Sequence, residues 1–277
     1  YEATYRFEHN NIREALYSKI PLKERQSIHF TIANYLYNRY SDNATNLESN
    51  IYAIANHYNN SNKNELNSIE KIKSAEINLK AGLKALSASA EMESWKYLQK
   101  GIEILPVNSW KDFYSLTLKL HTTAGEVAFF NGNHSEAIAI VDEVLHNAKS
   151  QIDKLKIYEI KMSYFTGMGE SRKALSLGID ALRLLHYKMP RKAYPLITRI
   201  ERLKLSLKLL TKDTDALLEL PEIKDENKLA ISRILIACTQ PSFVGYPEYF
   251  PYVTLKHINF TLNHGNSEYA PYAYIIY

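Results

Sequence analysis

Apolar residues recur along most of the chain at spacings of three and four, which is the periodicity of an amphipathic helix. After Pro21, four of them share one face of a predicted helix: Ile28, Ile32, Tyr35 and Leu36. The two-residue alternation of half-buried strands is nearly absent. The one plausible strand is 4–7, ahead of a helix predicted over 10–19. The pattern therefore predicts an all-α fold.

From about residue 46 the predicted helices come in pairs. These pairs are 64–87 with 90–105, 109–131 with 134–150, and 151–167 with 170–187. Turn signals separate the helices, among them Asn131-Gly132-Asn133 and Gly167-Met168-Gly169. Because short links between long helices force them to run antiparallel, each pair is predicted to be a helical hairpin.

The hairpins repeat small or apolar residues at matched offsets of 12, 16 and 19 positions. The three sets are Gly82 with Ser94, Leu98 and Gly101, Gly125 with Ala137, Val141 and Val144, and Met162 with Ala174, Gly178 and Ala181. In this respect the chain resembles the tetratricopeptide repeat, and Pro106 supplies the proline that often closes the second helix. The start-to-start spacings of 43 and 37 residues make the units irregular. The resemblance implies a right-handed superhelix of antiparallel hairpins with a concave groove.

A second resemblance lies near the N-terminus. The stretch Tyr5-Arg6-Phe7-Glu8-His9 leads into a helix that ends Ala15-Leu16-Tyr17-Ser18-Lys19-Ile20-Pro21. It resembles the end of the winged-helix subdomain of STAND-type predicted ATPases. The rest of the chain, including His264-Gly265-Asn266-Ser267, is similar to the helical region that follows this module in large bacterial serine/threonine kinase–ATPase–sensor histidine kinase proteins.

These resemblances imply a division of the chain into two parts. Residues 1–45 are predicted to be the C-terminal remnant of the winged-helix subdomain. Residues 46–277 are predicted to be a tetratricopeptide-like domain that is truncated at its C-terminus. The apolar, aromatic end at 269–277 would then be an unfinished hairpin, which favours self-association.

Composition and missing motifs exclude several functions. The 34 basic and 30 acidic residues give a net charge of +4, which argues against a dedicated nucleic-acid binder. The single cysteine, Cys238, lies in an apolar run and predicts a buried small side chain in a reducing cytoplasm. Neither a Gly-x4-Gly-Lys-Ser/Thr loop nor a His-Arg-Asp motif occurs, and the nine histidines show no metal-binding spacing. We therefore expect no catalytic residues, no metal and no cofactor.

A basic segment stands out between Lys188 and Lys212, where eight lysines and arginines face one acid, Glu201. Its predicted helix places five apolar residues on one stripe: Leu196, Ile200, Leu203, Leu207 and Leu210. In a repeat array this stripe is predicted to pack on its neighbours, with the charged face in water. The alternatives are contact with an anionic membrane surface, an acidic partner or nucleic acid.

Helix geometry predicts which side chains line the groove. The positions are counted from the first residue of each matched set, such as Gly125 or Met162. Successive residues of a helix are turned by about 100°, so the positions six and three before that residue, and one and four after it, lie on one narrow arc. Around Gly125 and Met162 the rule selects these partner-binding residues: Lys119, Thr122, Glu126, Phe129, Lys156, Glu159, Ser163 and Thr166. The packed face around Gly125 is predicted to hold His121, Ala124 and Ala128.

Together these features predict a non-catalytic interaction and regulatory scaffold within a multidomain signalling ATPase or kinase. Its partner would be a protein or peptide, or a neighbouring domain of the same chain. Two alternatives stay open. The helices could complete an enzyme whose active site lies in other domains, or the basic segment could serve as an adaptor for a membrane surface or nucleic acid.

Overall fold

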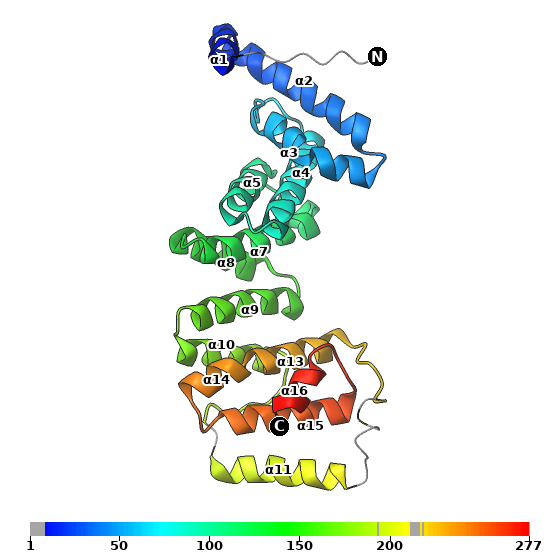
Figure 1. Ribbon diagram of the computed structural model, residues 1–277, viewed down its shortest axis with the longest axis vertical. Helices are drawn as coiled ribbons and strands as arrows, with labels where there is room; N and C mark the ends of the chain where they lie inside the picture. The colour runs from blue at the N-terminus through cyan, green and yellow to red at the C-terminus, as the bar shows by residue number, and fades with distance from the viewer. Residues whose placement is uncertain (1–8, 193, 211–216, 218, 277) are drawn as a thin grey trace. The chain divides into compact units, whose positions relative to one another are not determined.

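The computed structural model describes residues 9–192, 194–210, 217 and 219–276 (Figure 1). Over these ranges the chain is all-helical, and its helices pack as sequential antiparallel pairs, as the periodicity predicted. The same ranges contain no strand, so they form no winged helix. The predicted strand at 4–7 lies outside the described residues.

The chain forms two compact units, Tyr1–Asn133 and His134–Tyr277. The helices of the first unit are α1 (Asn10–Lys19), α2 (Leu22–Tyr40), α3 (Ala44–Asn59), α4 (Ser68–Ser87), α5 (Glu91–Ile104), α6 (Ser109–Asp112) and α7 (Tyr114–Phe130). Those of the second are α8 (His134–Asn147), α9 (Gln151–Gly167), α10 (Ser171–Leu184), α11 (Pro195–Leu209), α13 (Glu226–Ala237), α14 (Thr239–Gly245), α15 (Phe250–His264) and α16 (Ala270–Ile276). The predicted pairs α4–α5 and α9–α10 each lie within one unit, whereas the predicted pair α7–α8 is divided between the two units.

Helix starts follow local capping chemistry. Asn67 and Glu70 form a reciprocal capping box at the start of α4, and Ser150 and Asp153 form another at α9. At α13 the Asp225 side chain accepts a hydrogen bond from the Lys228 amide at 2.9 Å. Each cap satisfies a backbone amide that has no partner inside its own helix.

The α4–α5 hairpin closes through the small residues that the repeat pattern singled out. The Ser94 hydroxyl donates to the Gly82 carbonyl at 2.9 Å. A Cβ on Gly82 would lie 2.7 Å from Leu98 Cγ of α5. A Cβ on Gly101 of α5 would lie 2.7 Å from Leu120 Cδ2 of the next helix, α7. Only glycine therefore allows these helices to approach so closely.

The core of the first unit joins α2, α3 and α4. It includes the buried residues Ala33, Leu47, Ile51, Ile54, Ala55, Tyr58, Ile77 and Ala81. Because α2 packs against α3, this core spans the predicted boundary at 45/46. The predicted boundary separates a winged-helix remnant from a tetratricopeptide-like domain. Packing between the two segments does not test that assignment, so it stays a prediction.

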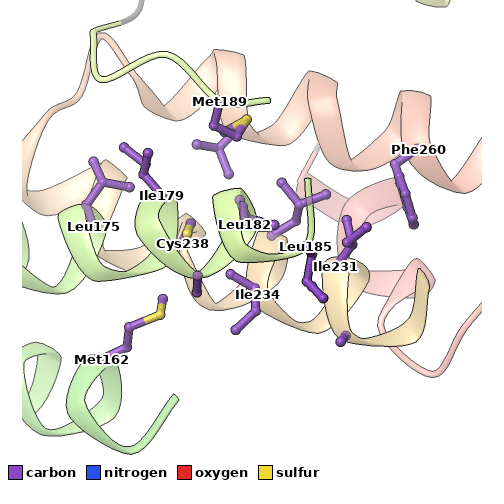
Figure 2. Close-up of a cluster of buried hydrophobic side chains, with 14 of the residues drawn as sticks. Met162, Leu175, Ile179, Leu182, Leu185, Met189, Ile231, Ile234, Cys238 and Phe260 are labelled. Carbon is purple, nitrogen blue, oxygen red and sulfur yellow. The ribbon is translucent and has the colours of Figure 1, made fainter. Parts of the chain in front are cut away.

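The main core of the second unit gathers α9, α10, α13 and α15 around Cys238 (Figure 2). The Cys238 thiol is completely buried, as predicted, and burial raises its pKa to about 12. It lies against Gly178 of α10, which has no side chain to displace it. A smaller cluster holds α11 against α15 and α16 through Leu205, Leu255, Ile258, Leu262 and Ala273.

Candidate interaction surface

The four groove residues predicted on α7 differ in exposure. Lys119 is exposed and Glu126 is half-buried, whereas Thr122 and Phe129 are buried. The Thr122 hydroxyl donates within its own helix, to the Leu118 carbonyl at 2.8 Å. Thr122 and Phe129 therefore do not line an open surface. The reason is that α7 is covered on most of its circumference, and nine of its 17 residues are buried.

The packed face predicted around Gly125 is confirmed, because four residues are buried there: His121, Ala124, Gly125 and Ala128. Helix periodicity located this face correctly. It could not show that neighbouring elements also cover part of the opposite arc.

On α9, Lys156 and Ser163 are exposed and Thr166 is half-buried. Glu159 is mostly covered, with 17% of its side chain exposed, and its Oε1 accepts a hydrogen bond from Arg233 Nε of α13 at 2.7 Å. Glu159, one of the predicted partner-binding residues, is thus already paired with a cation of its own unit. The α7 and α9 residues belong to different units, and the groove stays a prediction.

The buried histidine of the second unit has no features of a catalytic site. His257 Nε2 lies 2.9 Å from Ser232 Oγ, which also contacts Ser267 Oγ at 2.9 Å. Desolvation lowers the pKa of His257 to about 4. Because His257 and Ser232 are at most 1% exposed, the cluster ties α13 and α15 together and offers no access to a substrate.

Clusters of potential metal ligands and membrane-spanning helices are both absent from the part of the chain that the structure describes. No group of three or more His, Cys, Asp and Glu side chains in these ranges could hold a metal ion. None of the helices formed there is both long and apolar enough to cross a membrane.

The largest departure from the sequence-based prediction concerns α11. Its apolar stripe was expected to pack on neighbouring helices, but it is exposed. The exposed fractions are 67% for Leu196, 44% for Ile200, 61% for Leu203, 58% for Leu207 and 80% for Leu210. The prediction that this stripe is packed was therefore wrong. The helix packs on α15 and α16 through another face, which contains Leu205.

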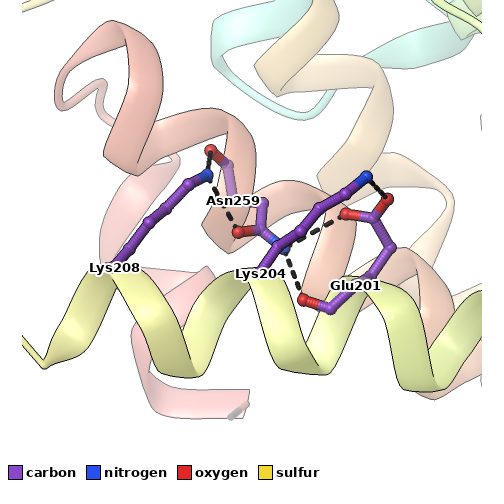
Figure 3. A network of polar contacts seen from close by, with 4 residues as sticks. All are labelled: Glu201, Lys204, Lys208 and Asn259. Carbon is purple, nitrogen blue, oxygen red and sulfur yellow. Dashed lines mark hydrogen bonds and ion pairs between the residues drawn. The ribbon is translucent and has the colours of Figure 1, made fainter.

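A polar network decides which face of α11 is buried (Figure 3). Asn259 of α15 donates through Nδ2 to the Glu201 carbonyl oxygen at 2.9 Å and to Glu201 Oε2 at 3.2 Å. Lys208 Nζ donates to Asn259 Oδ1 at 3.0 Å. Lys204 forms an ion pair with Glu201 at 2.8 Å. Buried polar groups require such partners, so the face carrying Glu201 must point toward Asn259.

Basic residues border the exposed stripe on both sides. The stripe covers an arc of about 80° on the helix, with Arg199 and Arg202 following on one side and Lys204 on the other. Both arginines are exposed, and Lys204 has 55% of its side chain exposed. The arginines also line a surface hollow of about 480 Å³ together with Pro195, Thr198 and Glu248.

No protein family, curated protein or solved structure matches this chain. The candidate surface is therefore defined by the structure alone. It is an apolar strip on α11 that is bordered by cations, and a polar network attaches the opposite face of the helix to α15. The excess of basic residues in 188–212 indicated a candidate contact segment. The spacing of its apolar residues, however, predicted the wrong orientation of α11.

Proposed function

We propose that this chain is a non-catalytic interaction and regulatory module and that the exposed stripe of α11 is its contact surface. The observation that carries the proposal is a row of five aliphatic side chains left in water on one helix of a folded unit. A contiguous exposed apolar strip rimmed by charges is typical of an interaction site. Isolated exposed apolar residues would need no such explanation.

The tetratricopeptide-like resemblance supports the same function. Antiparallel helix pairs closed by small residues, such as Gly82 against Leu98, are the building unit of such scaffolds. On this proposal the pairs build a superhelix in the cytoplasm, within a multidomain signalling ATPase or kinase. The module would hold a partner and pass its occupancy to a neighbouring ATPase domain.

Photocrosslinking tests whether the stripe is a contact surface. A photoreactive amino acid replaces Leu203 on the stripe in one variant, and Ile69 in the matched control. Ile69 is also an exposed aliphatic residue, but it lies on α4 in the first unit. We expect covalent adducts in cells from position 203 and none from position 69. Equal yields from the two positions, or none from 203, would remove the surface from consideration.

Calorimetry tests the rival, in which the helices belong to an enzyme. The intact chain is titrated with ATP in the presence of Mg²⁺. We expect no saturable heat, because the chain lacks the phosphate-binding loop pattern. Saturable micromolar binding would replace the scaffold with a nucleotide-binding function.

A further inference from the structure

We infer that the exposed face of α11 binds the surface of an anionic lipid bilayer. This rests on the proposed function, because it names the partner of the same surface. The occupant is argued from three properties of the face: the shape of its apolar strip, the charges that border it, and the way in which the helix is held.

The apolar strip has the form of an interfacial helix. From Leu196 to Leu210 it extends about 21 Å along the helix axis, at about 1.5 Å per residue. Its five members are all leucine or isoleucine and alternate by three and four positions. A helix that lies in the headgroup region buries such a strip to a shallow depth while its polar flanks stay hydrated. The strip lies on the side of α11 opposite the buried Leu205.

The charges that α11 itself places beside the strip are of one sign. Arg199, Arg202 and Lys204 frame it, and the only acid of α11, Glu201, is buried. Lys204 and Asn259 neutralise and hydrogen-bond that carboxylate on the packed side. Beside the strip, on the edge that carries Arg199 and Arg202, α11 therefore presents cations without a carboxylate of its own, which favours anionic headgroups along that edge of an apolar insertion.

The hollow beside Arg199 and Arg202 is suited to a headgroup phosphate. Arg199, Arg202 and Thr198 are among the residues that line it, and an arginine side chain pairs with phosphate through parallel hydrogen bonds. One carboxylate, that of Glu248, lines the same hollow, so the two cations outnumber it. Two of its lining residues, Pro195 and Thr198, belong to the first turn of α11, where the apolar strip begins with Leu196.

Other occupants fit the face less well. A second copy of the chain would bring the cations around one strip against the same cations around the other, and like charges repel. A protein partner is disfavoured by composition, because interface cores are enriched in aromatic residues and depleted in lysine. This strip contains no aromatic residue.

The helix is presented ready for binding. Leu205 is completely buried, and the contacts of Asn259 with Glu201 and Lys208 fix α11 against α15. Because the helix is already folded, it does not lose conformational entropy on binding the bilayer as a disordered membrane anchor does.

Vesicle flotation tests the inference on the intact chain. Phosphatidylcholine vesicles, with and without phosphatidylserine, are used at low and at raised salt. We expect flotation only with phosphatidylserine, and less of it as salt increases, because screening weakens the attraction. The double variant Arg199→Gln/Arg202→Gln should partition about thirtyfold more weakly. The triple variant Leu196→Ser/Leu203→Ser/Leu207→Ser should no longer float.

Matched controls separate this face from general stickiness. Arg13→Gln/Lys23→Gln removes two exposed cations from the first unit, and Ile69→Ser/Met92→Ser removes two exposed apolar side chains there. Both should float like the unmodified chain. All substituted residues are exposed, so each variant should keep the far-ultraviolet circular dichroism and melting of the unmodified chain.

Three outcomes would overturn the inference. They are no flotation with phosphatidylserine at low salt, equal flotation with neutral vesicles, and unchanged flotation of both α11 variants. If the chain instead binds an acidic amphipathic peptide through the same residues, the face is a protein-docking surface and only the lipid assignment is wrong. Crosslinks from position 203 to protein rather than lipid would lead to the same conclusion, whereas no crosslink at all would also end the proposed function.

Discussion

At the scale of single residues, Glu159 shows how a predicted binding residue can have an internal role. Its carboxylate is mostly covered and holds Arg233 of α13 at 2.7 Å. Glu159→Gln should lower the free energy of unfolding of the second unit by about 1 kcal/mol, because Arg233 is still partly exposed and solvent screens the pair. Urea unfolding followed by circular dichroism measures this change.

The matched control is Glu76→Gln, which changes an exposed glutamate in the middle of α4. It should leave the unfolding midpoint unchanged. If Glu159→Gln is equally silent, the contact with Arg233 contributes nothing to stability and Glu159 is available for a partner after all.

Periodicity predicted some residues of the candidate groove well and others badly, for a physical reason. It placed Gly125 and Ala128 on a buried face because a helix packs through the arc whose side chains are small and apolar. It placed Phe129 on an open arc because the periodicity of a single helix gives only the direction of a side chain relative to Gly125. It does not show whether another element covers that side chain. Whether a second arc is covered depends on neighbours that the sequence of α7 does not contain.

At the scale of elements, the position of α11 depends on one side chain of α15. Asn259 is separated from Glu201 by 58 positions and is 5% exposed. Asn259→Ala removes two donated hydrogen bonds and leaves Glu201 and Lys208 with fewer partners on the buried face. We expect the amides of α11 to exchange with deuterium at least about fivefold faster, at a cost of about 1–3 kcal/mol.

The control on the same helix is Asn263→Ala, since Asn263 is exposed. It should leave the exchange of α11 unchanged. Protection of α11 that survives Asn259→Ala would mean that Leu205 and its apolar neighbours suffice to hold the helix.

The sequence could not predict the orientation of α11, because the helix has two apolar arcs. One arc contains the five exposed aliphatic residues, and the other contains Leu205 and Leu209 together with Glu201. On hydrophobicity alone the first arc is the stronger candidate for burial. The partner that decides the matter, Asn259, is distant in sequence and becomes visible only when α15 is in place.

The buried histidine of α15 should make the second unit sensitive to acid. Burial lowers the pKa of His257 from 6.5 to about 4, so below about pH 6.5 the unfolded chain binds a proton that the folded chain excludes. Stability is therefore lost as the pH falls from about 6.5 to about 4, by up to about 3 kcal/mol. Urea unfolding of the chain at several pH values measures the slope.

Carboxylates titrate in part of the same range, so the slope is compared with that of His257→Gln, whose amide can still hydrogen-bond to Ser232. This variant should lose less stability on acidification. His134→Gln, at an exposed position of the same unit, should keep the original slope. Equal slopes for all three proteins would assign the acid sensitivity to other groups.

At the scale of the whole molecule, the sequence predicted the all-α class and most helix positions but not the division into units. Turn signals mark every helix end alike, and the turn Asn131-Gly132-Asn133 resembles the others although the units divide there. A division into compact units depends on how apolar side chains distribute between cores. That distribution is a property of packing and leaves no local signal.

The two units can be followed separately because both tryptophans, Trp95 and Trp110, lie in the first one. Fluorescence therefore reports on the first unit, whereas circular dichroism reports on all helices. Gly178 offers a specific way to weaken the second unit. A Cβ there would collide with the buried Cys238 Sγ and lie 2.8 Å from Met162 Cε. Gly178→Ala should cost about 1–3 kcal/mol through overpacking.

Because each unit has its own core, we expect Gly178→Ala to lower the circular dichroism midpoint of the second unit and to leave the tryptophan midpoint unchanged. Gly82→Ala, which overpacks Leu98 in the first unit, should lower the tryptophan midpoint instead. Gly167→Ala is the control, since a Cβ there meets nothing within 4 Å. If Gly178→Ala shifts both midpoints equally, the two units unfold as one cooperative body, and a ligand on α11 could then stabilise the helices of the first unit as well.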